Sequence, residues 1–184
     1  MFADNTLTPK EAIRLCALGT LAQAGEPMRY SELANAIRHF TSRITGPSLD
    51  IMGTSIELLK YEGLVTPIDG EGMEDDAALA LSDKGSAALT ALMTSRIRFQ
   101  GGEVNKLIAT LKLRFLHILE GTEQVRQIDL MIEGTDTEIA RLDDLRATHA
   151  GSPGYLSEWL DHDIRQLENH LTWLEELREK LSAT

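Results

Sequence analysis

Apolar and polar residues along the first 93 positions alternate with helical spacing in some stretches and with strand spacing in others. A helix is expected to begin at Thr8, because its hydroxyl can accept from the backbone of Glu11 and Pro9 suits the first helical position. The predicted elements, in chain order, are a helix from Thr8 to the turn at Gly25, a strand rung at Met28-Arg29, helices beginning at Ser31 and Ser48, strands over 64–68 and 77–81, and a helix beginning at Ser82.

This order of elements is that of a winged helix-turn-helix, a small module that lays one helix against a nucleic acid or a partner protein. The loop between the two strands, the wing, reads Asp69-Gly70-Glu71-Gly72-Met73-Glu74-Asp75-Asp76. It is too long and too charged for a tight hairpin turn. Its carboxylates make the wing acidic, and an acidic surface repels the phosphates of a nucleic acid.

Beyond Gly101-Gly102 the pattern contains only helix signals, arranged in three apolar stripes. The last two stripes flank the turn at 151–154, and each predicts a helix of about 28 residues, roughly 40 Å long at 1.5 Å per residue. A short Gly/Pro turn makes the two helices antiparallel neighbours. Their seam-like faces exceed what a small domain can cover, so we expect a homodimer with coiled-coil packing. The predicted chain is mainly α with a small β wing: a winged helix-turn-helix domain at 1–100, then a helical dimerisation domain at 101–184.

Charge and cysteine content narrow the range of functions. The formal net charge of −11 repels phosphate, so any DNA binding requires a local basic surface. Residues 1–100 carry 9 Lys and Arg against 13 Asp and Glu, whereas residues 101–184 carry 9 against 16. The single cysteine, Cys16, excludes an internal disulfide, and its apolar neighbours favour a buried core residue over a redox-sensing thiol. Neither a signal peptide nor a membrane-spanning run is evident, so we expect a cytoplasmic protein that does not contact membranes.

Motifs typical of enzymes are missing from the sequence, including phosphate-cradling glycine loops, zinc-protease motifs, nucleophile motifs and paired cysteine ligands. Glu158, His162 and Gln166 share a helix face, but a metal site there would need ligands from another segment. The sequence therefore predicts neither an enzyme nor a bound cofactor or metal.

Two stretches resemble the PadR-like transcriptional regulators. The first runs from Ser48 to Val65, ends in Glu62-Gly63-Leu64-Val65 and is followed after the wing by Leu81-Ser82-Asp83-Lys84-Gly85; the second is the terminal helix from Leu167 to Leu177. The resemblance implies a dimeric, repressor-like DNA-binding protein. In that family the terminal helices form the dimer, the helix after the Gly-Pro turn enters the major groove, and the wing touches the DNA backbone. Some members bind small aromatic effectors at the dimer interface.

The chain departs from that family where DNA contact is expected. Ile51-Met52-Gly53 stands where Thr-Leu-Tyr is common, Leu58 where a basic residue is frequent, and the acids 74–76 where the wing often carries arginine. These departures support an alternative function. In that alternative, the fold is a protein–protein module, an adaptor or antagonist that has lost DNA binding.

Candidate contact residues are basic, hydroxyl-bearing or aromatic. Arginine and lysine can clamp phosphates, and hydroxyls in the first turns of the presented helix can reach bases or phosphates. The same residues are consistent with a solvated surface, and Ser48 with a plain helix cap. Two tryptophans can sandwich a planar aromatic effector, or they can simply pack in the dimer interface. The predicted DNA contacts are Arg29, Arg38, Arg43, Ser48, Thr54, Ser55 and Lys60, and the predicted effector contacts are Trp159 and Trp173.

Overall fold

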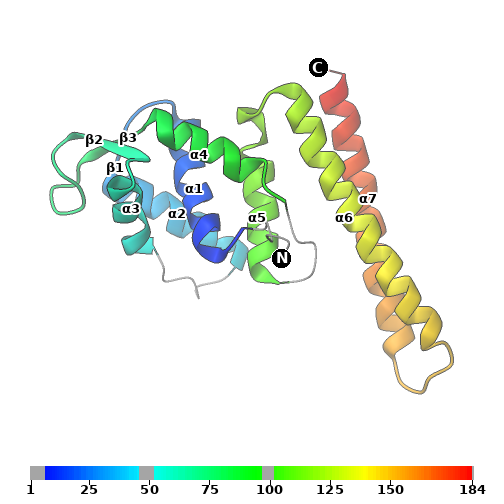
Figure 1. Cartoon of the computed structure of the whole chain (residues 1–184). Helices are drawn as coiled ribbons and strands as arrows, with labels where there is room; N and C mark the ends of the chain where they lie inside the picture. The colour runs from blue at the N-terminus through cyan, green and yellow to red at the C-terminus, as the bar shows by residue number, and fades with distance from the viewer. Residues whose placement is uncertain (1–6, 46–51, 97–101, 184) are drawn as a thin grey trace, which may run out of the picture. The chain divides into compact units, whose positions relative to one another are not determined.

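The computed structural model describes residues 7–45, 52–96 and 102–183, with the side chains of 52–55 left aside (Figure 1). The chain divides into two compact units, called here the N-terminal unit (up to Leu119) and the C-terminal hairpin (from Glu120). The N-terminal unit contains α1 (Pro9–Ala24), β1 (Met28–Arg29), α2 (Tyr30–Thr45), α3 (Met52–Tyr61), β2 (Val65–Asp69), β3 (Ala78–Leu81), α4 (Asp83–Met93), α5 (Glu103–Arg114) and the 3₁₀ turn η1 (Leu116–Ile118), and the hairpin contains α6 (Gly121–Thr148) and α7 (Leu156–Ser182). The predicted fold class, mainly helical with a small β wing, is confirmed.

Two of the predicted helix starts are confirmed in detail. At α1 the Glu11 backbone N–H donates to the Thr8 hydroxyl (3.3 Å), and the Glu11 carboxylate accepts from the Thr8 N–H (2.7 Å). At α4 the Ser82 hydroxyl accepts from the N–H of Gly85 (2.9 Å). Each contact satisfies a backbone donor that the first helical turn leaves unpaired.

The predicted role of Ser31 as a helix cap is wrong. Helix α2 begins one residue earlier, at Tyr30, and the Ser31 N–H donates to a carboxylate oxygen of Asp76 at 2.7 Å. The capping group of this helix therefore comes from the wing, 45 residues further along the chain. A cap that is distant in sequence leaves no local motif to recognise.

The three strands form one antiparallel sheet in the order β1-β3-β2. Met28 pairs with Leu79 and Val65 with Leu81, and an irregularity between Pro67 and Asp69 bends the edge of the wing. The inward faces of α1, α2, α3 and α4 meet beside this sheet and form the core of the N-terminal unit. Side chains at most 2% exposed in this core include Ile13, Leu15, Leu18, Leu33, Ile37, Ile56, Leu59, Leu79 and Leu89.

Helix α5 packs on α1 and α2 and belongs to the N-terminal unit. Its apolar face ends at Phe115, which is fully buried against Gly19 of α1. The sequence predicts residues 101–184 as one helical domain, because α5 shares the uninterrupted helical pattern of the C-terminal helices. Contacts rather than periodicity place this helix. The assignment of DNA binding to 1–100 and of dimerisation to 101–184 stays a prediction.

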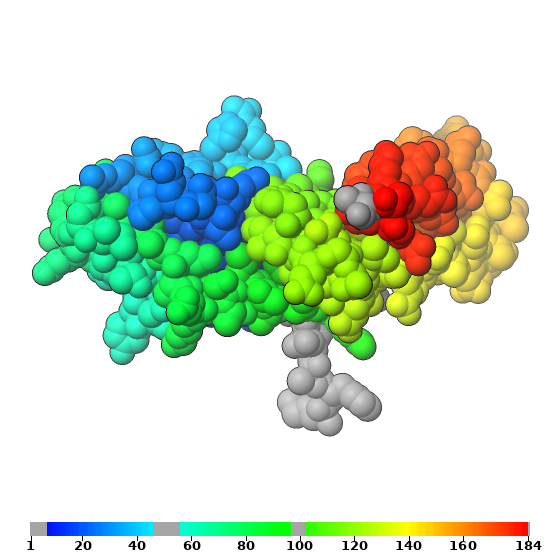
Figure 2. All heavy atoms as spheres, turned by 90° about the horizontal axis from the view of Figure 1, so that it is seen from above, coloured from blue at the N-terminus to red at the C-terminus, as the bar shows by residue number. Residues whose placement is uncertain are grey.

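The α6–α7 hairpin has the predicted form. The two helices have 28 and 27 residues, run antiparallel and lie side by side in both views (Figures 1 and 2). An ion pair joins Arg146 Nε to Asp161 Oδ1 at 2.5 Å, and a second joins Arg178 to Asp129. One inner apolar cluster comprises Leu142, Leu160 and Ile164, flanked by Ile139, Leu145 and Leu167.

The single cysteine is a core residue, as its apolar neighbours favoured. Cys16 is fully buried in α1, and burial raises the pKa of its thiol to about 11. Only the thiolate reacts with disulfide reagents, so native protein is expected to resist 5,5′-dithiobis(2-nitrobenzoic acid) at pH 8. The same reagent should titrate one thiol after denaturation in guanidinium. Rapid reaction of native protein would instead show that α1 opens or that Cys16 is a sensor.

Candidate nucleic-acid interface

The helix-turn-helix consists of α2 and α3, which pack on each other and on α1. Ile56 and Leu59 anchor α3, since each side chain is 1% exposed. Gly63, with φ of +70°, ends the turn after α3, a backbone conformation that favours glycine. The face of α3 away from the core is therefore held in a fixed orientation. That face is the one a helix-turn-helix presents to a partner.

Three carboxylates of the acidic wing, those of Asp69, Asp75 and Asp76, accept hydrogen bonds from backbone N–H or hydroxyl groups within the fold. Asp69 accepts the Ala78 N–H (2.6 Å), and Asp75 accepts the N–H groups of Glu71 (2.6 Å) and Gly72 (3.0 Å). The Ala78 N–H, with further help from an arginine, holds the pKa of Asp69 below its usual value. The Gly72 and Glu71 N–H groups do the same for the pKa of Asp75. These acids are structural parts of the loop as well as surface charges.

Asp76 joins the wing to the start of α2. Its carboxylate accepts the Ser31 N–H (2.7 Å) and the Ser31 hydroxyl (3.0 Å). Among the described residues it is the one non-glycine with positive φ, at +51°, a conformation that Asp tolerates better than most residues. The neighbouring Ala77 carbonyl accepts the Tyr30 N–H at 3.0 Å. The end of the wing, at Asp76 and Ala77, is thus hydrogen-bonded to the first residues of α2, the first helix of the helix-turn-helix.

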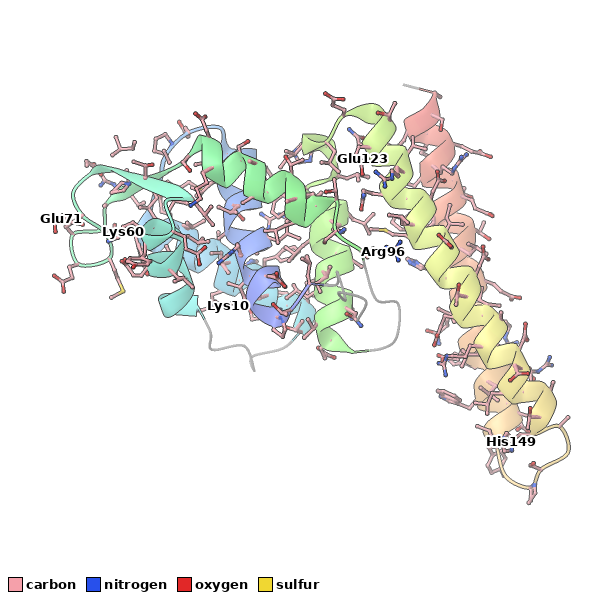
Figure 3. All side chains as sticks on the ribbon, in the orientation of Figure 1. Lys10, Lys60, Glu71, Arg96, Glu123 and His149 are labelled. Atoms are coloured by element: carbon pink, nitrogen blue, oxygen red, sulfur yellow. The ribbon has the colours of Figure 1, made fainter. Side chains whose placement is uncertain are left out.

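The wing tip is bound to α3. Lys60 Nζ donates to the Glu71 carbonyl at 2.6 Å and pairs with Glu57 Oε2 at 2.9 Å. The other Glu57 oxygen accepts the Met73 N–H at 3.3 Å. Figure 3 shows Lys60 on α3 and Glu71 on the wing loop in the same region. Two side chains one helical turn apart on α3 therefore hold the loop against the presented helix.

Arg29 holds the other side of the wing. Its Nη1 lies 2.9 Å from Asp69 Oδ2 and donates to the Asp76 carbonyl at 3.2 Å. Arg29 and Lys60 were predicted as phosphate contacts, and the structure gives each a carboxylate partner beside the wing. Both side chains remain partly exposed, at 48% and 31%. Their role toward DNA stays a prediction.

Arg38 and Arg43 lie on α2 and are exposed. Arg38 Nη1 donates to Asn35 Oδ1 at 2.9 Å. Within the described part of the chain, neither arginine forms an ion pair. Arg43 is in the last turn of α2. These two cations are therefore more available to an external anion than Arg29 and Lys60.

The three predicted hydroxyl contacts are not placed. Ser48 lies outside the described residues, and Thr54 and Ser55 lie in the first turns of α3 without described side chains. Their expected roles stay predictions.

The two predicted effector residues lie on α7. Trp159 is 53% exposed and Trp173 is 43% exposed. They are 14 positions apart in one continuous helix, which corresponds to about 21 Å at 1.5 Å per residue. A small planar molecule cannot touch both within one chain, so a shared site would take one tryptophan from each of two chains. His170 stacks on Trp173 with ring centroids 5.6 Å apart, and burial lowers the pKa of His170.

Sequence reasoning missed two buried or half-buried charges. The Arg14 guanidinium of α1 pairs with the Glu62 carboxylate at 2.7 Å and so joins α1 to the end of α3. Lys112 of α5 is fully buried and donates to the Ser95 carbonyl just beyond α4. Neither residue stands out in its local apolar pattern. In the described ranges no cluster of His, Cys, Asp and Glu is suited to a metal ion, and no helix is long and apolar enough to cross a membrane.

Comparison with known proteins identifies the family. A family model described as "Putative AphA-like transcriptional regulator" matches residues 2–178. The chain belongs to the AphA-like family of transcriptional regulators. This match confirms the regulator class that the PadR-like resemblance implied. No curated protein matches the chain.

Solved structures similar to this AphA-like protein include two of PadR from Bacillus subtilis. The first is 14% identical, with 96% of this chain and 98% of that chain covered and a TM-score of 0.36. The second, PadR in complex with operator DNA, is 18% identical, with 91% and 98% covered and a TM-score of 0.33. At these identities and scores no contact is transferred from PadR to this chain.

Proposed function

We propose that this AphA-like regulator binds duplex DNA through α3 and represses transcription from the sites it occupies. The observation that carries the proposal is the regulator-family match across almost the whole chain, on a fold that contains a helix-turn-helix with a wing. In such modules the second helix of the pair reads base edges in the major groove, while flanking groups hold the backbone.

The DNA contact proposed for each side chain follows from the groups that it already binds within the fold. Arg38 and Arg43 are assigned to phosphates, because both are exposed and neither is paired with a carboxylate in the described ranges. Thr54 and Ser55, in the first turns of α3, and Ser48, which precedes α3 in the sequence, are assigned to bases or phosphates. No wing contact is assigned to Asp75 or Asp76, whose carboxylates are bound to backbone N–H groups.

Dimerisation is assigned to the C-terminal hairpin. Its α7 carries three of the large exposed apolar side chains of the described chain, Leu156, Trp159 and Trp173, and Tyr155 immediately precedes the helix. Exposed aromatic residues on one helix are typical of a protein interface. A two-fold symmetric pair would present two copies of α3 to a duplex.

Replacing Arg43 by alanine tests the DNA role. Gel shifts with genomic fragments enriched on the purified protein should show about tenfold weaker binding by Arg43→Ala, because one charge-assisted phosphate contact is lost. The slope of log affinity against log salt should fall by about 0.9. Arg165→Ala, the same charge change on α7, is the matched control and should bind like wild type. Equal or absent retention by wild type and Arg43→Ala at low salt would contradict the proposal.

A second candidate function is a protein–protein module that no longer binds DNA. The observation that favours it is the acidic wing, whose neighbouring cations Arg29 and Lys60 are already paired. Three apolar side chains in this region are exposed: Ile68 on β2 by 61%, Met73 on the wing by 57% and Tyr61 at the end of α3 by 88%. This function requires that a stoichiometric protein partner co-purify and that DNA be ignored at every salt concentration.

A further inference from the structure

Two cations beside the wing are already paired with carboxylates, one from the wing and one from α3 itself. Arg29 contacts Asp69, and Lys60 contacts Glu57 while it donates to the Glu71 carbonyl. A carboxylate and a phosphate offer a guanidinium or ammonium group the same kind of acceptor, two or three oxygens that share negative charge. The pairs therefore occupy the donors that a DNA backbone would use.

We propose that two carboxylates, Asp69 of the wing and Glu57 of α3, are internal competitors of the DNA backbone. They form an autoinhibitory contact that keeps Arg29 and Lys60 from phosphate until DNA displaces them. This inference rests on the proposed function, since it concerns the regulation of the same DNA-binding surface. On this proposal, two specific ion pairs, rather than the net charge, cause the weak DNA affinity that is expected of an acidic protein.

The exposure of the two pairs suits an exchangeable contact. The side chains are 48% and 52% exposed in the Arg29–Asp69 pair and 31% and 36% exposed in the Lys60–Glu57 pair. Partly solvated pairs are weak and exchange partners readily, whereas a fully buried pair would be a permanent structural element. Arg29 also keeps its contact to the Asp76 carbonyl, which holds the guanidinium near the wing when Asp69 is released.

The carboxylates of the wing differ in what they bind, so they differ in what their removal should do. Asp75 and Asp76 bind N–H groups and hold the loop together. Asp69 pairs with the Arg29 guanidinium and also accepts the Ala78 N–H. Glu74 is exposed and has no partner among the described residues. Only the carboxylates that hold a cation are competitors; Glu74 acts through long-range repulsion that salt screens.

The test compares Asp69→Asn with Glu74→Gln, two variants with the same charge change in the same wing. Asparagine at position 69 keeps an oxygen for the Ala78 N–H but loses its hold on Arg29. The probe is a mixed-sequence DNA duplex of about 30 base pairs, because phosphate contacts do not depend on sequence. DNA affinity is measured by filter binding over a series of salt concentrations. Each variant is measured in the wild-type and Arg29→Ala backgrounds.

Asp69→Asn is expected to bind about fivefold tighter than wild type. Its salt slope should be steeper, because in wild type the charge that Asp69 regains when Arg29 leaves it offsets part of the cation release from the DNA. Glu74→Gln should change affinity less than Asp69→Asn does. In the Arg29→Ala background the gain from Asp69→Asn should vanish, while the small effect of Glu74→Gln should persist.

The outcomes distinguish failure of the internal competition from failure of the proposed DNA binding. If wild type binds DNA and Asp69→Asn gains nothing, or gains equally without Arg29, the internal competition is overturned and DNA binding stands. If no variant retains DNA at low salt, the proposed function and the competition both fail. Glu57→Gln, which keeps an acceptor for the Met73 N–H and frees Lys60, serves as the second variant should Asp69→Asn disturb the wing; it too must bind more tightly than wild type.

Discussion

Replacing Phe115 by alanine is expected to lower the free energy of unfolding of this regulator by about 3–5 kcal/mol. The ring is fully buried and fills the space between α5 and α1. Its removal loses the transfer free energy of a large aromatic side chain and leaves a cavity that two packed helices cannot fully close. The measurement is guanidinium unfolding followed by far-ultraviolet circular dichroism, at one fixed protein concentration because an oligomer's stability depends on concentration.

The partner of Phe115 makes this prediction sharper. A Cβ added at Gly19 would lie 2.4 Å from the Phe115 ring, so Gly19→Ala alone should cost about 1–2 kcal/mol despite the better helix propensity of alanine. In the Phe115→Ala background the clash is gone, and Gly19→Ala should stabilise α1 by about 1 kcal/mol. The effect of one substitution thus changes sign with the other. Additive effects would mean that α1 and α5 do not pack as described.

Gly85→Ala is expected to destabilise the N-terminal unit by about 2 kcal/mol. A Cβ at this position would lie 2.0 Å from the Leu64 carbonyl oxygen, which is backbone and cannot rotate away. That oxygen also accepts the Ser82 hydroxyl at 3.0 Å, so moving it would disturb the cap of α4. The clash outweighs the gain of about 1 kcal/mol that alanine normally brings inside a helix.

Gly121→Ala is the matched control for Gly85→Ala. Gly121 begins α6, and a Cβ there would meet no atom within 4 Å. This substitution should therefore leave the unfolding midpoint unchanged or raise it slightly. If both glycine variants unfold like wild type, α4 does not approach the junction between α3 and β2 as closely as the structure has it.

Local signals predicted the elements of this fold well. Thr8 and Ser82 both cap the helices expected of them, because a capping hydroxyl and the backbone N–H that donates to it are only three residues apart. The position of α5 was not predictable in the same way. Its apolar stripe resembles those of α6 and α7, and periodicity reports that a face is buried without reporting which helices bury it.

The candidate site was less predictable than the fold, because its contacts are distant in sequence. Arg29 meets the Asp76 carbonyl across 47 positions, and Ser31 meets the Asp76 carboxylate across 45. Composition alone presents the wing as a run of like charges that repels DNA. The structure separates acids that fold the loop, such as Asp75, from acids that hold cations, and no local pattern distinguishes the two kinds.

Both tryptophans of this protein lie on α7, and the N-terminal unit has none. The intrinsic indole emission of the chain therefore comes only from the hairpin. Both rings are partly exposed, so their emission maximum depends on whatever covers that helix. Unfolding or binding that is confined to the N-terminal unit does not directly involve these two rings. The tryptophan emission of the natural chain therefore reports on what happens to the C-terminal hairpin.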